Sequence, residues 1–194
     1  MLSEKITDFD YEYYDPHADH FKTGHTKDRD KQWTVLFFYP ADFTFVCPTE
    51  LEDMAQYQKT FDAFGQTKIY MISSDTVYAH QERVKQNPKL HGFPYAMIGD
   101  RNHHISQMFG VYDEQSGNAQ RSTIIIDPDK KIVSFDVIID QVGRGSREIV
   151  RRLAALQYAR THKDHMCPSS REPGEQAITP GECLIYPKDL FKIQ

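Results

Sequence analysis

Residues 33–39 of this chain read WTVLFFY, a nearly unbroken run of apolar, aromatic and β-branched side chains that ends at Pro40. A strand with one solvent-exposed face alternates apolar and polar residues, whereas a strand buried on both faces reads as a continuous apolar run. Because strands of the second kind are typical of α/β proteins, this stretch predicts a central strand of an α/β sheet.

The sequence after this strand alternates between helical and strand patterns. Leu51, Met54, Phe61 and Phe64 recur about every 3.5 residues among polar residues, which predicts a helix that ends near Gly65. The same patterns predict further strands at 68–73, 122–126 and 132–139, and further helices at 76–86, 105–109 and 146–160.

The last two predicted strands flank the turn sequence Asp127-Pro128-Asp129, which indicates an antiparallel hairpin. The earlier β-α-β alternation implies a right-handed crossover between parallel strands. We therefore expect a mixed central sheet flanked by helices in a domain over residues 1–160. Residues 161–194 show no sustained periodicity and contain four of the ten prolines, so they predict a C-terminal tail.

Composition argues against several classes of partner. The formal charge of −5, without a long run of Lys or Arg, offers no attraction to nucleic acid or to anionic lipid. Residues 1–10 are acidic and polar where a signal peptide would be basic and then apolar, and no run approaches about 18 apolar residues. We expect a cytoplasmic protein that binds neither nucleic acid nor membrane.

The chain contains three cysteines, Cys47, Cys167 and Cys183. Three widely spaced cysteines do not make a disulfide framework, and in a reducing compartment they are catalytic, metal-binding or inert. His162, His165 and Cys167 form an H-x-x-H-x-C pattern, but a fourth ligand and the usual zinc spacing are lacking. We expect no metal site.

Cys47 lies between the buried strand and the following helix, where α/β sheets usually place their chemistry. Pro48 suits the first helical position, which would put Cys47 at the N-cap, near unpaired backbone N–H donors. Glu50 would then be the third helical residue, able to accept from the N-cap N–H or to hold a nearby Arg. A reactive cysteine needs helix-terminus dipoles and a guanidinium to favour its thiolate.

Three other residues could serve a thiolate at this place. The Thr44 hydroxyl can donate to the sulfur or to an oxygen of a bound substrate, and Arg121 and Arg144 lie at element ends from which a long cation can reach a sheet-edge site. Taken singly, each of these residues is explained without catalysis, as a turn hydroxyl or a solvated charge, and a lone free cysteine is more often an inert buried thiol. Their joint spacing favours a catalytic Cys47.

The order P-x-x-x-T-x-x-C within FFYPADFTFVCPTEL closely resembles the active-site segment of typical 2-Cys peroxiredoxins. Further segments resemble that family in the same order, namely MIGD before Arg101, FGV at 109–111, RSTIIIDP at 121–128, VGR at 142–144 and MCP at 166–168. The similarity is greatest to the bacterial AhpC-like branch. It implies a thioredoxin fold, reduction of hydrogen peroxide and organic hydroperoxides, and no metal or organic cofactor.

The resemblance also implies a role for each matching residue. Cys47 would be the peroxidatic cysteine, Cys167 of the partner subunit the resolving cysteine, and their bridge an intersubunit disulfide. The supporting residues would be Thr44 as hydrogen-bond partner, Arg121 as the guanidinium of the pocket, Pro40 as its lid, and Glu50 and Arg144 as the residues that hold Arg121. The resemblance further implies a homodimer, commonly assembled into a ring of five dimers, and an external dithiol reductant that is thioredoxin-like or AhpF- or AhpD-like.

The tail departs from the family pattern. After Cys167-Pro168 the chain has Ser169-Ser170 where a small residue and then Trp are usual. Cys183 has no counterpart in the family, so it is either without a role or an alternative or additional resolving thiol. An oligomeric holdase chaperone or a peroxide-sensing redox relay is the alternative function. A thioredoxin-like dithiol oxidoreductase is disfavoured, because Cys47-Pro48-Thr49-Glu50 supplies one sulfur where C-x-x-C supplies two.

We predict an enzyme that resists overoxidation, because the Gly-Gly-Leu-Gly insert and the Tyr-Phe tail motif of sensitive members are both absent. In those members the two motifs slow unwinding around the peroxidatic cysteine. A modest excess of peroxide during turnover should therefore leave little sulfinic acid on Cys47, as measured by mass spectrometry. Sulfinic acid on Cys47 in most molecules would contradict this expectation.

Overall fold

The computed structural model describes residues 2–29, 31–65 and 67–179. The chain divides into two compact units, residues 1–150 and residues 151–194. The domain boundary expected after residue 160 stays a prediction. Cys183 lies outside the described residues.

The first unit contains a seven-stranded sheet with the order β2-β1-β5-β4-β3-β8-β9, and a separate two-stranded sheet of β6 and β7. The strands are β1 (Asp10–Asp15), β2 (His20–His25), β3 (Trp33–Phe38), β4 (Thr67–Ser73), β5 (Ala96–Gly99), β6 (Tyr112–Asp113), β7 (Asn118–Ala119), β8 (Arg121–Ile126) and β9 (Ile132–Ile138). Strands β3, β4 and β5 are parallel and the other pairings are antiparallel. The expected mixed sheet and its β8–β9 hairpin are confirmed.

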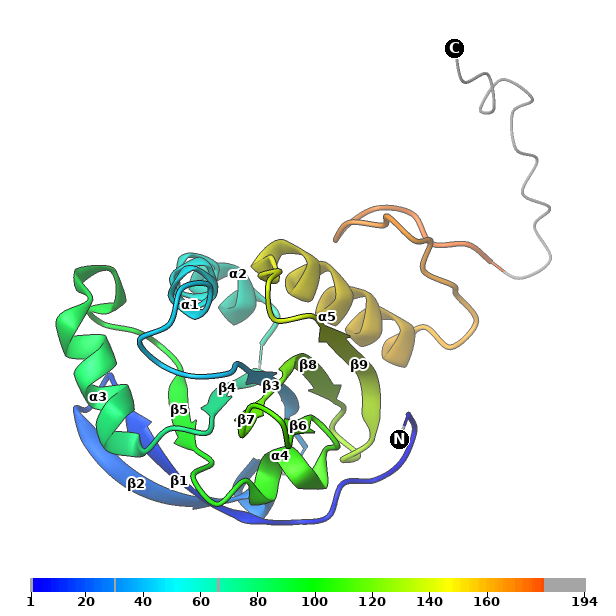
Figure 1. The fold of residues 1–194 in the computed structure, drawn as a ribbon. Helices are drawn as coiled ribbons and strands as arrows, with labels where there is room; N and C mark the ends of the chain where they lie inside the picture. Colours follow the sequence, from blue (N-terminus) through cyan, green and yellow to red (C-terminus); the bar gives the residue numbers. More distant parts are fainter. Residues whose placement is uncertain (1, 30, 66, 180–194) are drawn as a thin grey trace. The chain divides into compact units, whose positions relative to one another are not determined.

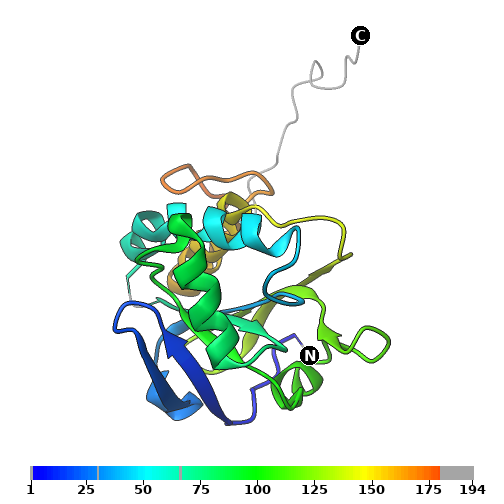
Figure 2. The same cartoon turned by 60° about the vertical axis from the view of Figure 1, so that its left-hand side comes forward.

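Short helices lie on both sides of this sheet, with α1 and α2 on one side and α4 on the other (Figures 1 and 2). The helical segments are α1 (Cys47–Gln56), α2 (Gln58–Ala63), α3 (Val77–Gln86), α4 (His104–Met108) and α5 (Ser146–Thr161), with 3₁₀ turns η1 (Thr26–Arg29) and η2 (Pro88–Leu90). The single helix expected up to Gly65 is in fact two, α1 and α2. The break is at Tyr57, whose N–H is shared between the Asp53 and Met54 carbonyls in a tightened last turn.

Strand β3 is buried on both faces, as its continuous apolar sequence predicts. Leu36 and Phe38 point to the face covered by α4 and join a core cluster with Ile105, while Val35 and Phe37 point to the opposite face. All four side chains are at most 1% exposed. The strand is therefore the centre of the first unit's core.

Register places one arginine at the carboxyl end of β3. Strand β8 runs antiparallel to β3 and pairs Ser122 with Phe38, so Arg121 lies just beyond the last residue of β3. Strand β9 in turn pairs Ile138 with Arg121. The loop after β3, the start of β8 and the end of β9 therefore meet at one edge of the sheet.

The N-terminal hairpin β1–β2 was not predicted, because its sequences DYEYYD and HFKTGH are mostly polar. Its pairing depends on contacts that a local pattern does not reveal. The ring of Tyr11 lies against Gly24 of β2, where an added Cβ would be 2.6 Å from a ring carbon, so a larger residue would displace the Tyr11 ring. The Tyr11 hydroxyl also hydrogen-bonds to that of Tyr70 at 2.9 Å.

The second unit contains most of α5 and the segment that carries Cys167. Met166 and Ile178 pair through an isolated antiparallel bridge, and Arg171 lies over the ring of Tyr158 at 4.1 Å. In the described part of the chain, no helix combines the length and the apolar character needed to span a bilayer.

Truncation of the core at Leu36 should destabilise the protein strongly. Leu36→Ala removes a side chain that is 1% exposed and should lower the free energy of unfolding by about 2–5 kcal/mol. Chemical denaturation at fixed protein concentration measures the change. Leu2→Ala is the matched control at a 62% exposed position and should change stability by about 0.5 kcal/mol or less. Equal effects of the two substitutions would contradict the assigned core.

Candidate active site

Cys47 is the first residue of α1, and the N-cap is Val46. The sequence had placed Cys47 itself at the N-cap. The helix begins one residue earlier because Val46 already has helical dihedral angles, and its carbonyl accepts from the N–H groups of Thr49 and Glu50. Pro48 then occupies the second helical position, where a missing N–H also costs no helical hydrogen bond. Cys47 is 1% exposed, so its sulfur lies inside the protein.

Arg121 contacts the sulfur directly. Its Nη1 lies 3.2 Å from Sγ of Cys47, while its Nε donates to the Asp140 carbonyl at 2.7 Å and its Nη2 lies 3.0 Å from the Asp140 carboxylate. Burial lowers the pKa of Arg121, but the Cys47 sulfur, Glu50 and Asp140 outweigh this effect, so the pKa is raised overall. The guanidinium therefore stays protonated next to the sulfur.

Glu50 lies between two guanidinium groups and is 2% exposed. Its Oε2 accepts from Nη1 of Arg121 at 2.7 Å, and its Oε1 accepts from Nε of Arg144 at 2.9 Å and from the Arg144 backbone N–H at 2.8 Å. Of the two roles expected for Glu50, the structure therefore shows the one in which it holds arginines. The same carboxylate fixes the loop before α5 to α1.

Hydrogen-bond acceptors and an aromatic ring hold the guanidinium of Arg144 in place. Its Nη1 donates to the Ser122 carbonyl at 2.6 Å, its Nη2 donates to the Phe38 carbonyl at 2.8 Å, and its guanidinium carbon lies 3.6 Å from the centroid of the Phe37 ring. Burial lowers the pKa of Arg144, and the bonds to Glu50 offset this only in part. Arg144 thus links the ends of β3 and β8.

Pro40 and Thr44 lie in the loop between β3 and α1. Pro40 is buried, and together with Arg121 it lines a cavity of about 460 Å³ that extends toward β7 and β9. Thr44 is exposed, and its hydroxyl donates to the Ala41 carbonyl at 2.9 Å. The structure therefore brings Pro40, Arg121 and Cys47 to one place, while the Thr44 hydroxyl is bonded within the loop.

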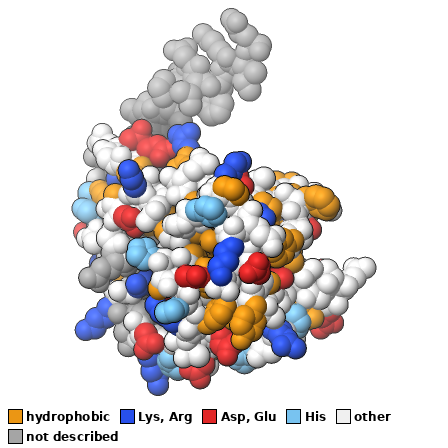
Figure 3. Space-filling model, turned by 90° about the vertical axis from the view of Figure 1, so that its left-hand side faces the viewer, with side chains coloured by type: hydrophobic (Ala, Val, Ile, Leu, Met, Phe, Trp, Pro, Cys, Tyr) orange, Lys and Arg blue, Asp and Glu red, His pale blue; other side chains and the backbone are white. Residues whose placement is uncertain are grey.

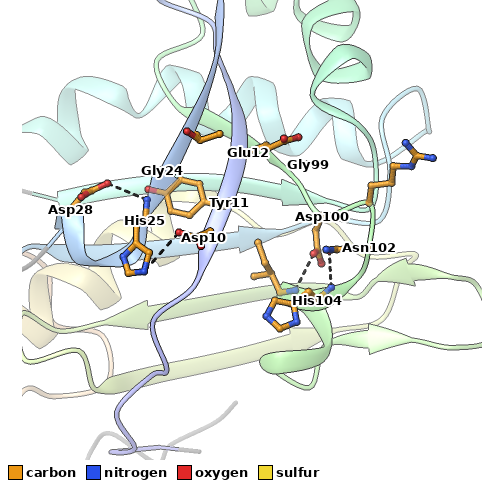
Figure 4. A pocket seen from close by; sticks show the side chains of 13 residues that line it. Asp10, Tyr11, Glu12, Gly24, His25, Asp28, Gly99, Asp100, Asn102 and His104 are labelled. Carbon is orange, nitrogen blue, oxygen red and sulfur yellow. Dashed lines mark hydrogen bonds and ion pairs between the residues drawn. The ribbon is translucent and has the colours of Figure 1, made fainter.

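A larger cavity of about 980 Å³ lies between the β1–β2 hairpin and the start of α4 (Figure 4). Its walls include Tyr11, His25, Asp100 and His104, and none of the residues that line it belongs to the site predicted from sequence. The cavity is therefore separate from the cluster around Cys47.

Cys167 is half-buried within the second unit, where its thiol donates to the Ala155 carbonyl at 3.6 Å. Cys47 and Cys167 are both free thiols. In the described ranges no group of three or more His, Cys, Asp or Glu side chains has the geometry to hold a metal ion.

A family model described as the AhpC/TSA family matches residues 2–135. The chain belongs to the AhpC/TSA family. It is 37% identical over 185 residues to alkyl hydroperoxide reductase C of Staphylococcus epidermidis, covering 95% of this chain and 97% of that protein. It is 38% identical over 186 residues to alkyl hydroperoxide reductase C of Staphylococcus haemolyticus, again covering 95% and 97%.

Solved structures agree with this membership of the AhpC/TSA family. The structure is similar to that of Enterococcus faecalis AhpC with a TM-score of 0.81 at 35% identity, covering 86% of this chain and 98% of that one. Similarity to a reduced 2-Cys peroxiredoxin of Plasmodium vivax, with a TM-score of 0.84 at 24% identity over 93% and 94% of the chains, supports the fold. The expected thioredoxin fold and the resemblance to AhpC-like peroxiredoxins are confirmed.

Asp140 and Gly143 belong to the site around Cys47 but were not predicted. The β8–β9 hairpin could have indicated Asp140, because it lies two residues beyond the partner of Arg121. At Gly143 an added Cβ would lie 3.2 Å from a methyl group of Val46, so the loop passes close to the start of α1. No local sequence pattern indicates this close approach.

Loss of the Glu50 charge should destabilise the protein far more than loss of a carboxylate whose cationic partner is exposed. Glu50→Gln leaves Arg121 and Arg144 buried without their shared anion, and should lower the free energy of unfolding by about 3–5 kcal/mol. Glu52→Gln on the same helix is the matched control, since Glu52 pairs with Lys89, whose side chain is 73% exposed. This pair should be worth about 0–1 kcal/mol. Denaturation curves that show similar losses for both variants would rule out this account of Glu50.

Proposed function

We propose that this chain is a thiol-dependent peroxidase that reduces hydrogen peroxide and organic hydroperoxides through the thiolate of Cys47. The observation that carries the proposal is the contact of 3.2 Å between the Arg121 guanidinium and the Cys47 sulfur in a buried cluster. A permanent cation beside a sulfur stabilises its anion, and the anion is the nucleophilic form of cysteine. Membership of the AhpC/TSA family supports the same activity.

In the first step the Cys47 thiolate attacks one oxygen of the peroxide and the O–O bond breaks. The sulfur is oxidised to a sulfenic acid, and the other oxygen leaves as an alkoxide or hydroxide that takes up a proton. Arg121 stabilises the negative charge that develops on the leaving oxygen. The Thr44 hydroxyl, which donates to the Ala41 carbonyl, accepts a hydrogen bond from the O–H of the peroxide. Pro40 shields the sulfur from water. Glu50 and Arg144 keep Arg121 in position.

In the second step Cys167 of the partner subunit attacks the sulfenic sulfur and releases water, which leaves an intersubunit disulfide. A disulfide requires Cα atoms within about 7 Å, and a sulfur that is 1% exposed cannot meet a partner thiol in place. The first turn of α1 must therefore unwind. An external dithiol, either thioredoxin-like or from an AhpF- or AhpD-like protein, then reduces the disulfide by thiol exchange.

A homodimer is supported by the exposed edge of the sheet at β9. This strand is the last in the sheet order, and Val137 and Ile139 at its end are 43% and 67% exposed. Apolar side chains exposed at the edge of a sheet are suited to packing against a second copy of the chain.

Assembly of dimers into a ring of five is supported by a second surface. Phe43, Phe45 and Tyr78 are 53%, 96% and 67% exposed, in the active-site loop and on α3. Figure 3 faces the side of the molecule where α3 and β2 lie, and hydrophobic side chains gather there in groups between charged ones. Exposed aromatic side chains of this kind are enriched at interfaces between proteins.

We also propose a cytoplasmic location.

Peroxide consumption with a dithiol reductant tests the proposed function. Cys47→Ser should abolish activity, because a hydroxyl cannot replace the thiolate, and Cys167→Ser should stop catalytic turnover after the first oxidation. Cys183→Ser is the matched control and should retain most activity. Activity that survives Cys47→Ser would contradict the proposal, whereas a holdase activity should survive this substitution.

Non-reducing gels assign the resolving cysteine. Peroxide should produce a cross-linked dimer in the wild type and in Cys183→Ser, but not in Cys47→Ser or Cys167→Ser. A dimer that disappears in Cys183→Ser and persists in Cys167→Ser would assign the resolving role to Cys183 instead.

A further inference from the structure

A buried polar network lies beside the active-site loop 39–46 and has no role in the chemistry proposed above. His80 on α3 is fully buried, with its Nδ1 2.7 Å from Oδ2 of Asp42 and its Nε2 3.1 Å from the Ile98 carbonyl. Tyr39, also fully buried, donates its hydroxyl to Oδ1 of Asp42 at 3.0 Å. The network thus joins the loop to α3 and to β5.

Hydrogen-bond partners fix the number of protons in this network. Because a carbonyl oxygen can only accept, Nε2 of His80 carries a hydrogen. A second hydrogen lies between Nδ1 and the Asp42 carboxyl group, since two lone pairs cannot form a bond. Burial and the nearby carboxylates of Asp42 and Asp75 raise the pKa of Tyr39 well above its usual value, so the phenol keeps its proton. His80 and Asp42 therefore form a pair with no net charge, which explains how both are accommodated in the interior.

Asp42 holds the middle of the loop by its backbone as well as by its side chain. It lies two residues after Pro40 and two before Thr44, and its N–H donates to Oδ2 of Asp75 at 2.6 Å. The same oxygen accepts from the Ser73 hydroxyl at 2.7 Å. The loop is therefore anchored at Asp42 from two directions.

The residue after this anchor has an unfavourable backbone conformation. Phe43 has a φ of 56°, in the left-handed region that bulky residues rarely adopt. Such a conformation persists only where surrounding contacts enforce it. The bonds to Asp42 on one side, and the Thr44 hydroxyl bond to the Ala41 carbonyl across it, are contacts of this kind.

We propose that His80 is a positioning residue for the reaction with peroxide, because through Asp42 it fixes the loop that carries Pro40 and Thr44 and leads into Cys47. The inference rests on the proposed function. Arg121 contacts both the sulfur and Glu50 without involving this network. The His80–Asp42 pair therefore affects how the loop positions peroxide, and it does not affect the intrinsic reactivity of the sulfur.

Two substitutions separate the two bonds of the imidazole. In His80→Gln the amide nitrogen can replace Nε2 and keep the bond to Ile98, while the bond to Asp42 is lost. In His80→Asn the amide nitrogen can replace Nδ1 and keep the bond to Asp42, while the bond to Ile98 is lost. His104→Gln, at an exposed position on α4, is the matched control.

Two reactions of Cys47 are measured for each variant in a Cys167→Ser, Cys183→Ser background. His80→Gln should lower the rate constant of oxidation by hydrogen peroxide by about tenfold or more, as expected for a misplaced reacting group. It should not lower the rate of alkylation by iodoacetamide, because alkylation needs the thiolate and a loosened loop only increases access to a sulfur that is 1% exposed. His80→Asn should lose less peroxide reactivity than His80→Gln, and His104→Gln should match the parent in both reactions.

An unchanged peroxide rate in His80→Gln, or equal losses in both reactions, would overturn the inference. If His80→Gln does not fold, Asp42→Asn removes the carboxylate but keeps the backbone bond to Asp75, and it should show the same split between the two reactions. A parent protein that does not react with peroxide at all would refute the proposed function itself, before any variant is compared.

Discussion

The site depends on one buried carboxylate placed between two buried guanidinium groups. Removing Glu50, Arg121 and Arg144 from water carries a large desolvation penalty, which is offset only when their hydrogen bonds are satisfied with good geometry. Glu50 meets this condition by accepting from both arginines, and Arg144 also donates to the carbonyls of Ser122 and Phe38. Because these groups come from α1, β8, β3 and the loop before α5, one ion network links these four segments beside Cys47.

The sequence predicted the parts of the fold that local patterns determine. The apolar run at 33–39 indicated a central strand, and the turn at Asp127-Pro128-Asp129 indicated the hairpin. These two features already place Arg121 at the end of β3, once β8 is taken as its antiparallel neighbour. The break at Tyr57 and the hairpin β1–β2 could not be predicted, because they depend on packing between segments and not on a period within one.

The sequence predicted the site residues whose positions follow from the motif and from strand register. It predicted less well the contacts that depend on side-chain orientation. Cys47, Glu50 and Arg121 come together as expected, but the Thr44 hydroxyl points to the Ala41 carbonyl. His80 gave no signal, because its partner Asp42 is 38 residues away and a lone histidine on a helix has many possible roles. Cys167 stays a prediction, because its proposed partner belongs to another subunit.

The sulfur of Cys47 also decides the charge balance of the ion network. The two arginines carry two positive charges and Glu50 one negative charge, so an anionic sulfur makes the buried sum zero. A sulfenic acid or a disulfide sulfur is neutral, and would leave one positive charge faced by Asp140, whose side chain is 68% exposed. Since an unbalanced buried charge is costly, the fold favours the reduced site over the oxidised one. In the proposed cycle this preference would raise the reduction potential of the Cys47 disulfide and so assist its reduction by an external dithiol.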